Sequence, residues 1–136
     1  MQAFGLKVKP YNFIYIRDNI LRKSTNIDSL KEDYDNATFT ITRKRTRDTF
    51  ILLCLDEYTL TLGKLMHAMK NIPNLGMVYL GGGWNACTRE AKDYALENKI
   101  SIVVTGELHG AIQKDDYWNF YKVDEDGNKV EHIRKQ

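Results

Sequence analysis

The densest charged feature of the sequence is a basic run at residues 43–47. Four of its five side chains are cations: Arg43, Lys44, Arg45 and Arg47. Such a cluster can neutralise several phosphates at once, and a twisted two-stranded ribbon that carries it is narrow enough to enter a groove of DNA. Charged residues at strand ends also keep a loop solvated and discourage edge pairing, so a purely structural interpretation stands beside the phosphate-binding one.

An acidic pair, Asp56 and Glu57, follows a long apolar run, at the kind of strand end where α/β proteins place functional side chains. Together with Asp48 before the run and Lys64 after the pair, these carboxylates can hold Mg²⁺ or Mn²⁺ for phosphodiester hydrolysis. Acidic residues just before a helix are also stabilised by its dipole, which is the simpler explanation.

The remaining candidates carry weaker signals. Gly81–Gly83 fits neither common nucleotide-binding motif and predicts a strand-to-helix turn. His67 and His109 are isolated in sequence, so each is expected to have an ordinary surface or packing role. Several aromatic side chains can stack on bases or line a partner surface, although packing or a dimer contact near the C-terminus is more economical: Trp84, Trp118, Phe120 and Tyr121.

The first half of the chain must position the basic run. Residues 11–16, aromatic and β-branched, predict a strand, and residues 24–36 predict a helix that Ser24-Thr25-Asn26 caps and that carries Ile27, Leu30 and Tyr34 on one face. Residues 38–42 alternate as a half-buried strand does. Residues 50–55 are apolar without a break, which predicts a central strand covered by helices on both faces. These last two strands predict a hairpin with the basic run at its tip.

The second half has the rhythm of an α/β protein. The patterns predict helices at 60–71, at 88–98 and shortly after Gly106, with strands at 77–80 and 100–104 between them. The apolar face of the first helix is expected to consist of Leu62, Leu65, Met66 and Met69. Right-handed crossovers and a partly parallel sheet follow. Residues 117–133 predict a C-terminal hairpin with a two-residue turn at Asp126-Gly127.

Composition restricts the class of protein. A chain of 136 residues fits one domain with a true core, and its net charge of +2 neither demands nor excludes an acidic partner. Cys54 and Cys87 lack the spacing of a disulfide framework or a zinc site, so reduced, buried thiols are expected. No apolar run has the length of a signal sequence or a membrane span, which predicts a cytoplasmic or nuclear protein that does not enter a membrane.

Residues 76–112 contain a Thr-led helix of the form T-x-E-A-x-x-Y-A, an Asn-Lys exit, and an apolar strand that runs into Gly-Glu-Leu. The residues of this pattern are Thr88, Glu90, Ala91, Tyr94, Ala95, Asn98, Gly106, Glu107 and Leu108. With this pattern, the stretch from Thr38 to Ile112 resembles the Mrr-type restriction endonuclease-like domains of the PD-(D/E)XK nuclease class. The matching residues shape the fold and carry no chemistry.

The catalytic signature of that family lies on the hairpin, where this sequence departs from it. Working members place an acidic metal ligand early in the first strand and Glu-x-Lys or Gln-x-Lys on the second. Alignment of the apolar strand puts Thr40 at the acid and Leu-Cys-Leu, residues 53–55, at the triplet. Threonine and leucine supply no anionic metal ligand, and no lysine remains to stabilise charge at the phosphate. The resemblance therefore implies a degenerate metal site.

We therefore predict one α/β domain over residues 1–136, with a three-layer restriction endonuclease-like core at about 24–113, in which helices flank a mixed sheet, and a C-terminal β-hairpin at about 117–133. The predicted function is a non-catalytic nucleic-acid-binding or assembly module without a cofactor, with DNA favoured over RNA and with a homodimer or a larger complex as a further partner. The phosphate contacts would come from the basic run, with Lys64 in addition.

Two alternatives remain open. One is a nuclease that depends on Mg²⁺ or Mn²⁺ and uses Asp48, Asp56, Glu57 and Lys64 as migrated active-site residues. The other is a protein-interaction or scaffolding domain that uses the aromatic C-terminal hairpin as its contact surface.

Overall fold

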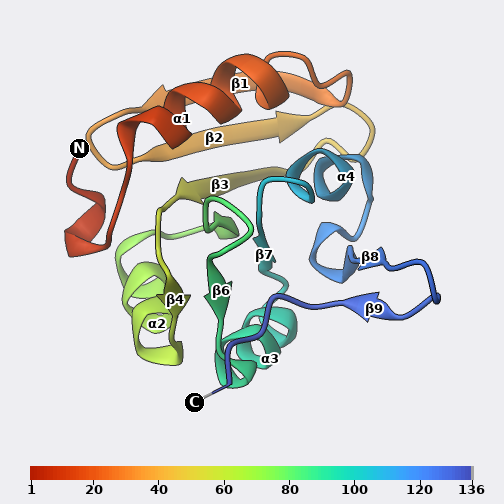
Figure 1. The fold of residues 1–136 in the computed structure, drawn as a ribbon. Coiled ribbons are helices and arrows are strands. Elements are labelled where there is room, and N and C mark those ends of the chain that lie inside the picture. The colour runs from red at the N-terminus through yellow and green to blue at the C-terminus, as the bar shows by residue number, and fades with distance from the viewer. Residues whose placement is uncertain (136) are drawn as a thin grey trace.

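A computed structural model describes residues 1–135 of the chain, which form an α/β fold around a mixed five-stranded sheet (Figure 1). The strands are β1 (Ile27–Asp33), β2 (Thr38–Arg43), β3 (Thr49–Cys54), β5 (Leu75–Tyr79) and β7 (Ser101–Val103), in the order β1-β2-β3-β5-β7. The first three are antiparallel and the last three parallel. The apolar β3 is the central strand, as its composition predicts, because only a strand covered on both faces can bury Leu52 and Leu53 together.

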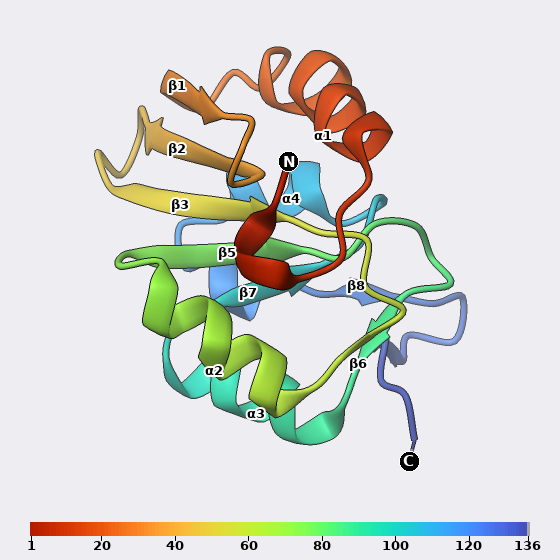
Figure 2. The same ribbon diagram turned by 90° about the vertical axis from the view of Figure 1, so that its left-hand side faces the viewer.

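Helices cover both faces of the sheet, and no helix among residues 1–135 is long and apolar enough to cross a bilayer. On one face lie α1 (Pro10–Ile16), its π-helical continuation η2 (Arg17–Leu21) and α4 (Leu108–Gln113). On the other lie the two crossover helices, α2 (Leu62–Asn71) and α3 (Arg89–Glu97) (Figures 1 and 2). Thr88 caps α3 by accepting a hydrogen bond from the Ala91 amide at 3.2 Å, as expected.

Two predictions for the N-terminal part are wrong. The expected strand at 11–16 is the helix α1, because Pro10 starts it and Phe13 and Ile16, one turn apart, are its buried side chains. Phe13 stacks on Phe39 of β2 with ring centroids 4.2 Å apart. The expected helix at 24–36 contains β1 instead, whose polar sequence suits an edge strand that is mostly exposed.

The C-terminal part differs from the prediction in two details. Residues 117–119 form a 3₁₀ helix, η3 (Tyr117–Asn119), rather than a strand. The expected hairpin is present as β8 (Lys122–Val123) and β9 (Lys129–Val130), but its loop has five residues rather than two. The reason is the Asp124 carboxylate, which accepts hydrogen bonds from the amides of Asp126 and Asn128, each at 2.9 Å, and so closes a wider turn.

Smaller elements complete the fold. A short 3₁₀ turn, η1 (Ala3–Gly5), precedes α1, and β4 (Thr59–Leu60) pairs in parallel with β6 (Ala86–Cys87). The C-terminal segment continues this small sheet, since Ile133 forms a bridge with Cys87. In α2 the buried apolar positions are Leu65 and Ala68, whereas Met66, expected to be buried, is 48% exposed because it lies on the outer side of the helix.

Candidate nucleic-acid interface

The first residue of the basic run, Arg43, is a buried structural brace. Its side chain is 1% exposed, at the end of β2. It binds the Asp48 carboxylate with two parallel hydrogen bonds, of 2.8 Å from Nε and 2.7 Å from Nη2. The other three N–H groups donate to main-chain carbonyls: Ile112 at 3.1 Å, Lys114 at 2.7 Å and Asp115 at 2.8 Å.

All five donors of the Arg43 guanidinium therefore have an acceptor, which is the full capacity of the group. Its central carbon also lies 5.0 Å from the ring centroid of Tyr117. Arg43 therefore has no donor left for a phosphate in this structure, and it is not among the phosphate contacts proposed below. The physical reason is that the carbonyls at the end of α4 need donors, and the planar fork of a buried arginine can supply several of them at once.

The rest of the basic run forms the tip between β2 and β3, and we call Lys44, Arg45 and Arg47 the tip cations. All three side chains are exposed. Arg45 is held down, since its Nε lies 2.7 Å from the Asp115 carboxylate and its Nη2 donates to the Gln113 carbonyl. Within residues 1–135, no carboxylate lies within ion-pair distance of Lys44 or Arg47. These two cations border a hollow of about 390 Å³, which Asp28 and Arg43 also line.

The main chain of the tip is positioned by Asn26, a residue to which sequence reasoning gave only a helix-capping role. Its carbonyl accepts from the Lys44 amide at 2.9 Å, and its side-chain oxygen accepts from the Arg45 amide at 3.1 Å. Its side-chain nitrogen donates to the Ile112 carbonyl at 2.9 Å. Asn26 is buried, so these bonds hold the tip in one conformation. The sequence could not predict this role, because an asparagine before a strand is too common to indicate it.

Lys64, the fifth expected phosphate contact, lies away from the tip in the first turns of α2. Its ammonium is 2.8 Å from Glu57 Oε2, while Glu57 Oε1 accepts from the Lys7 amide at 2.9 Å. Glu57 is 5% exposed, and the pair closes the connection between β3 and α2. The structure thus gives Lys64 an internal partner and does not bring it together with the tip cations.

The other members of the proposed acidic site do not converge either. Asp56 and Glu57 are consecutive residues, and Asp56 has a different set of partners: the side-chain amides of Asn85, at 3.1 Å, and Asn12, at 3.5 Å. Asp48 lies beyond the opposite end of β3, and six residues of strand span about 20 Å. Among residues 1–135, no group of three or more His, Cys, Asp or Glu side chains could hold a metal ion.

The glycine run takes part in this arrangement through Gly81 alone. Its φ of +107° is accessible to glycine, and an added Cβ would lie 2.8 Å from the Asn85 amide nitrogen and 3.0 Å from Asp56 Oδ1. The run is thus a turn that makes room for the Asp56 cluster, and it leads from β5 into the short strand β6 rather than directly into a helix as predicted. The histidines are separate from it: His67 Nε2 lies 2.8 Å from the Phe4 carbonyl oxygen, and His109 is exposed.

Both cysteines are buried and free, as expected. Burial raises the pKa of the Cys54 thiol to about 12 and that of Cys87 to about 11, because the thiolate would lose its hydration. Both side chains are therefore neutral, and neither is an activated nucleophile.

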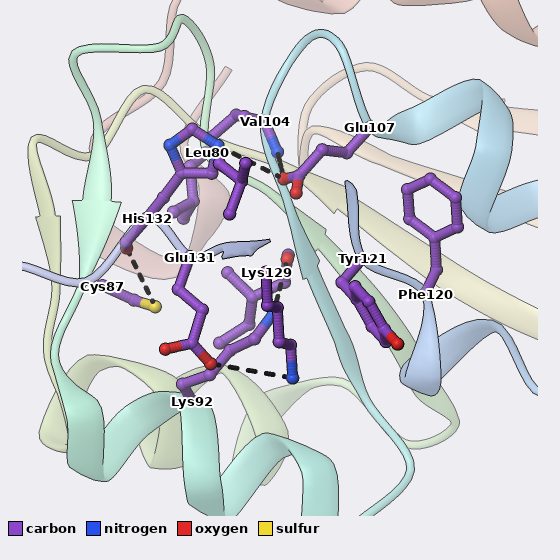
Figure 3. Close-up of a pocket in the computed structure, with 12 residues that line it drawn as sticks. Leu80, Cys87, Lys92, Val104, Glu107, Phe120, Tyr121, Lys129, Glu131 and His132 are labelled. Atoms are coloured by element: carbon purple, nitrogen blue, oxygen red, sulfur yellow. Dashed lines mark hydrogen bonds and ion pairs between the residues drawn. The ribbon is translucent and has the colours of Figure 1, made fainter. Parts of the chain in front are cut away.

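A polar cluster beside the C-terminal hairpin was not predicted as a cluster (Figure 3). Glu107 is 7% exposed and accepts a hydrogen bond from the Val104 amide at 3.0 Å, with His132 Nε2 3.9 Å from the same carboxylate oxygen. The enclosed space at its centre has a volume of about 10 Å³, enough for one water and no substrate. Glu107 thus serves the main-chain turn before α4. Its distance in sequence from His132 leaves no local signal for the pair.

Comparison of the chain with protein families, with curated proteins and with solved structures finds no match. The evidence for the candidate interface is therefore its geometry alone, in which one arginine is buried and the three tip cations are exposed.

Proposed function

We propose that the chain is a nucleic-acid-binding module on a restriction endonuclease-like core, and that the tip cations contact the phosphates. One observation carries this proposal: Lys44 and Arg47 are exposed on a braced hairpin tip and have no acidic partner within residues 1–135. The buried hydrogen bonds of Asn26 fix the main chain that carries these cations, which lowers the entropic cost of bringing them to a phosphate backbone.

The order of elements supports the proposed core. A helix, three antiparallel strands, a crossover helix and a parallel strand follow one another along the chain, and the T-x-E-A segment forms α3. The positions aligned with the catalytic triplet, Leu53, Cys54 and Leu55, are at most 2% exposed. An apolar floor of this kind offers no ligand to a divalent cation, which favours binding over cleavage for this module.

The test is a titration of labelled DNA by fluorescence anisotropy, with duplex and single-stranded 20-mers. The variant Lys44→Ala/Arg47→Ala should raise the Kd at least about ten-fold at 0.1 M salt, and should reduce the slope of log K against log salt by about 2. The matched control is Lys31→Ala/Lys70→Ala, which removes two exposed lysines elsewhere and the same net charge. Circular dichroism should show native folding in both variants.

Equal weakening by the two double variants would mean that only net charge matters, and would refute a role for the tip. Magnesium- or manganese-dependent nicking that is lost in Glu57→Ala would replace the binding proposal with the nuclease alternative.

A further inference from the structure

A second basic surface lies beyond the β7 edge of the sheet, between α3 and the C-terminal hairpin. It is a groove of about 340 Å³, lined by four cations, two carboxylates and three aromatic side chains. On the α3 side, Lys92 donates a hydrogen bond from Nζ to the Ile102 carbonyl of β7 at 3.2 Å. Cations in excess over carboxylates, interleaved with aromatic rings, form the kind of lining to which nucleic-acid strands bind.

Tyr121 is the exposed aromatic side chain in this groove. It is 50% exposed, and Lys129 Nζ lies 4.8 Å from its ring centroid and 3.6 Å from Glu131 Oε1 (Figure 3). Its neighbour Phe120 is packed on α4, since a Cβ added at Gly110 would lie 2.4 Å from the Phe120 ring. The structure therefore fixes one ring and leaves the adjacent one exposed beside a cation, where a base and a phosphate can be bound together.

The groove continues toward the β2–β3 tip, which carries the tip cations. Lys114 and Tyr121 border both the groove and a neighbouring hollow of about 490 Å³, which also contacts Gln113. Arg45 of the tip binds the Gln113 carbonyl and the Asp115 carboxylate on either side of Lys114. Residues 113–115 thus contact both Arg45 of the tip and the groove. A nucleic-acid strand bound at the tip can follow this surface to Tyr121.

We propose that this groove binds a single strand of nucleic acid, with Tyr121 stacking on a base and Lys129 contacting the backbone. The inference rests on the proposed nucleic-acid binding and specifies its substrate class. The chemical reason is accessibility: the bases of a duplex stack on one another and present no face to a side chain, whereas each base of a single strand presents its π-face.

The experiment uses the full chain and a fluorescein-labelled oligo-dT of about 12 nucleotides, single-stranded or annealed to oligo-dA, a length on the scale of one single-strand binding site. Tyr121→Ala should raise the Kd for the single strand about five-fold or more and leave the Kd for the duplex within about two-fold. The matched control is Tyr11→Ala: Tyr11 is 65% exposed, has Lys9 Nζ 5.9 Å from its ring, and lies on α1, on the other face of the sheet from α3. It should change neither affinity.

A spectroscopic readout places the strand in the groove. The sequence has two tryptophans, Trp84 and Trp118, and only Trp118 borders the groove. In a Trp84→Phe background, addition of the unlabelled single strand should quench the remaining fluorescence, and Tyr121→Ala should weaken that quenching.

Equal single-strand affinity of Tyr121→Ala and Tyr11→Ala would refute the proposal that the groove binds a single strand, whatever the Lys44→Ala/Arg47→Ala variant shows. Equal weakening of single strand and duplex would overturn the substrate class. A dimer that dissociates in Tyr121→Ala would show a protein interface instead. If Lys44→Ala/Arg47→Ala behaves as its control does while Tyr121→Ala shows the expected loss, the tip proposal fails and the groove stands.

Discussion

Replacement of Arg43 by alanine should lower the free energy of unfolding far more than replacement of any tip cation. The change removes five hydrogen bonds from one buried group. It leaves the Lys114 and Asp115 carbonyls without their side-chain donor, whereas the Ile112 carbonyl keeps its bond from Asn26. It also leaves the Asp48 carboxylate without its cation. The loss is therefore structural, although the residue lies within the run that looks most like a binding site.

The magnitude follows from the burial of each partner. Removal of one member of a buried ion pair costs about 3–5 kcal/mol, and each hydrogen bond to a charged group contributes about 1.5–3 kcal/mol before water replaces it. The Asp48 side chain is 36% exposed and can regain hydration, which places the expected loss near the lower end, at about 3 kcal/mol. In a chain of 136 residues this lowers Tm by about 10 °C.

The assay is urea unfolding at pH 7 followed by circular dichroism, with a common m-value to establish that the transitions are comparable. Arg47→Ala is the control, because Arg47 is exposed, and it should change the free energy of unfolding by less than about 0.5 kcal/mol. Arg43→Lys should recover part of the loss, since an ammonium has three donors for five acceptors. A loss below about 1 kcal/mol in Arg43→Ala, or an equal loss in Arg47→Ala, would refute the role of Arg43 as a brace.

Two further predictions concern ionisation. The Arg43 guanidinium, with Thr46 adding a hydrogen bond, holds the pKa of the Asp48 carboxyl below its ordinary value. A depressed folded pKa stabilises the protein above the unfolded pKa of about 3.9, so this stabilisation should disappear as pH falls below about 4, and urea unfolding from pH 6 to 3 should show a shallower decline in Arg43→Ala than in the wild type. Cys54 and Cys87, with pKa values raised to about 12 and 11, should resist Ellman's reagent at pH 8 and react at once in urea. Fast labelling of the native protein would contradict their burial.

Local patterns predicted the elements that are strongly periodic or strongly apolar. The strand β3 and the helix α3 could be predicted from adjacent residues alone. An unbroken apolar run indicates a strand that is buried on both faces, and a threonine before a helical pattern indicates an N-cap. For the N-terminal part, a strand was predicted where the helix α1 lies and a helix where the strand β1 lies, because tertiary packing decides these elements. The aromatic segment of α1 has a high strand propensity, which the packing of Phe13 on Phe39 overrides.

The site was harder to predict than the fold, because its residues differ in partners that lie far away in sequence. Arg43 and Arg47 are four residues apart and of one type, yet the carbonyls that bury Arg43 belong to residues 69 to 72 positions later. The acidic pair shows the same limit. Asp56 and Glu57 are adjacent, but Asp56 binds the side-chain amide of Asn85 and Glu57 binds the main-chain amide of Lys7 and the ammonium of Lys64.

The long-range contacts also connect the two parts of the proposed interface. Arg43 from within the fold and Arg45 from its surface both bind residues 112–115, at the end of α4 and the start of the connection to η3. This segment carries Lys114, which borders the groove that contains Tyr121. The basic run therefore combines one buried cation, Arg43, and one exposed but paired cation, Arg45, with two exposed cations, Lys44 and Arg47, that have no acidic partner within residues 1–135. The segment that binds Arg45 of the tip thus also borders the groove, so the two parts of the proposed interface meet at one stretch of the chain.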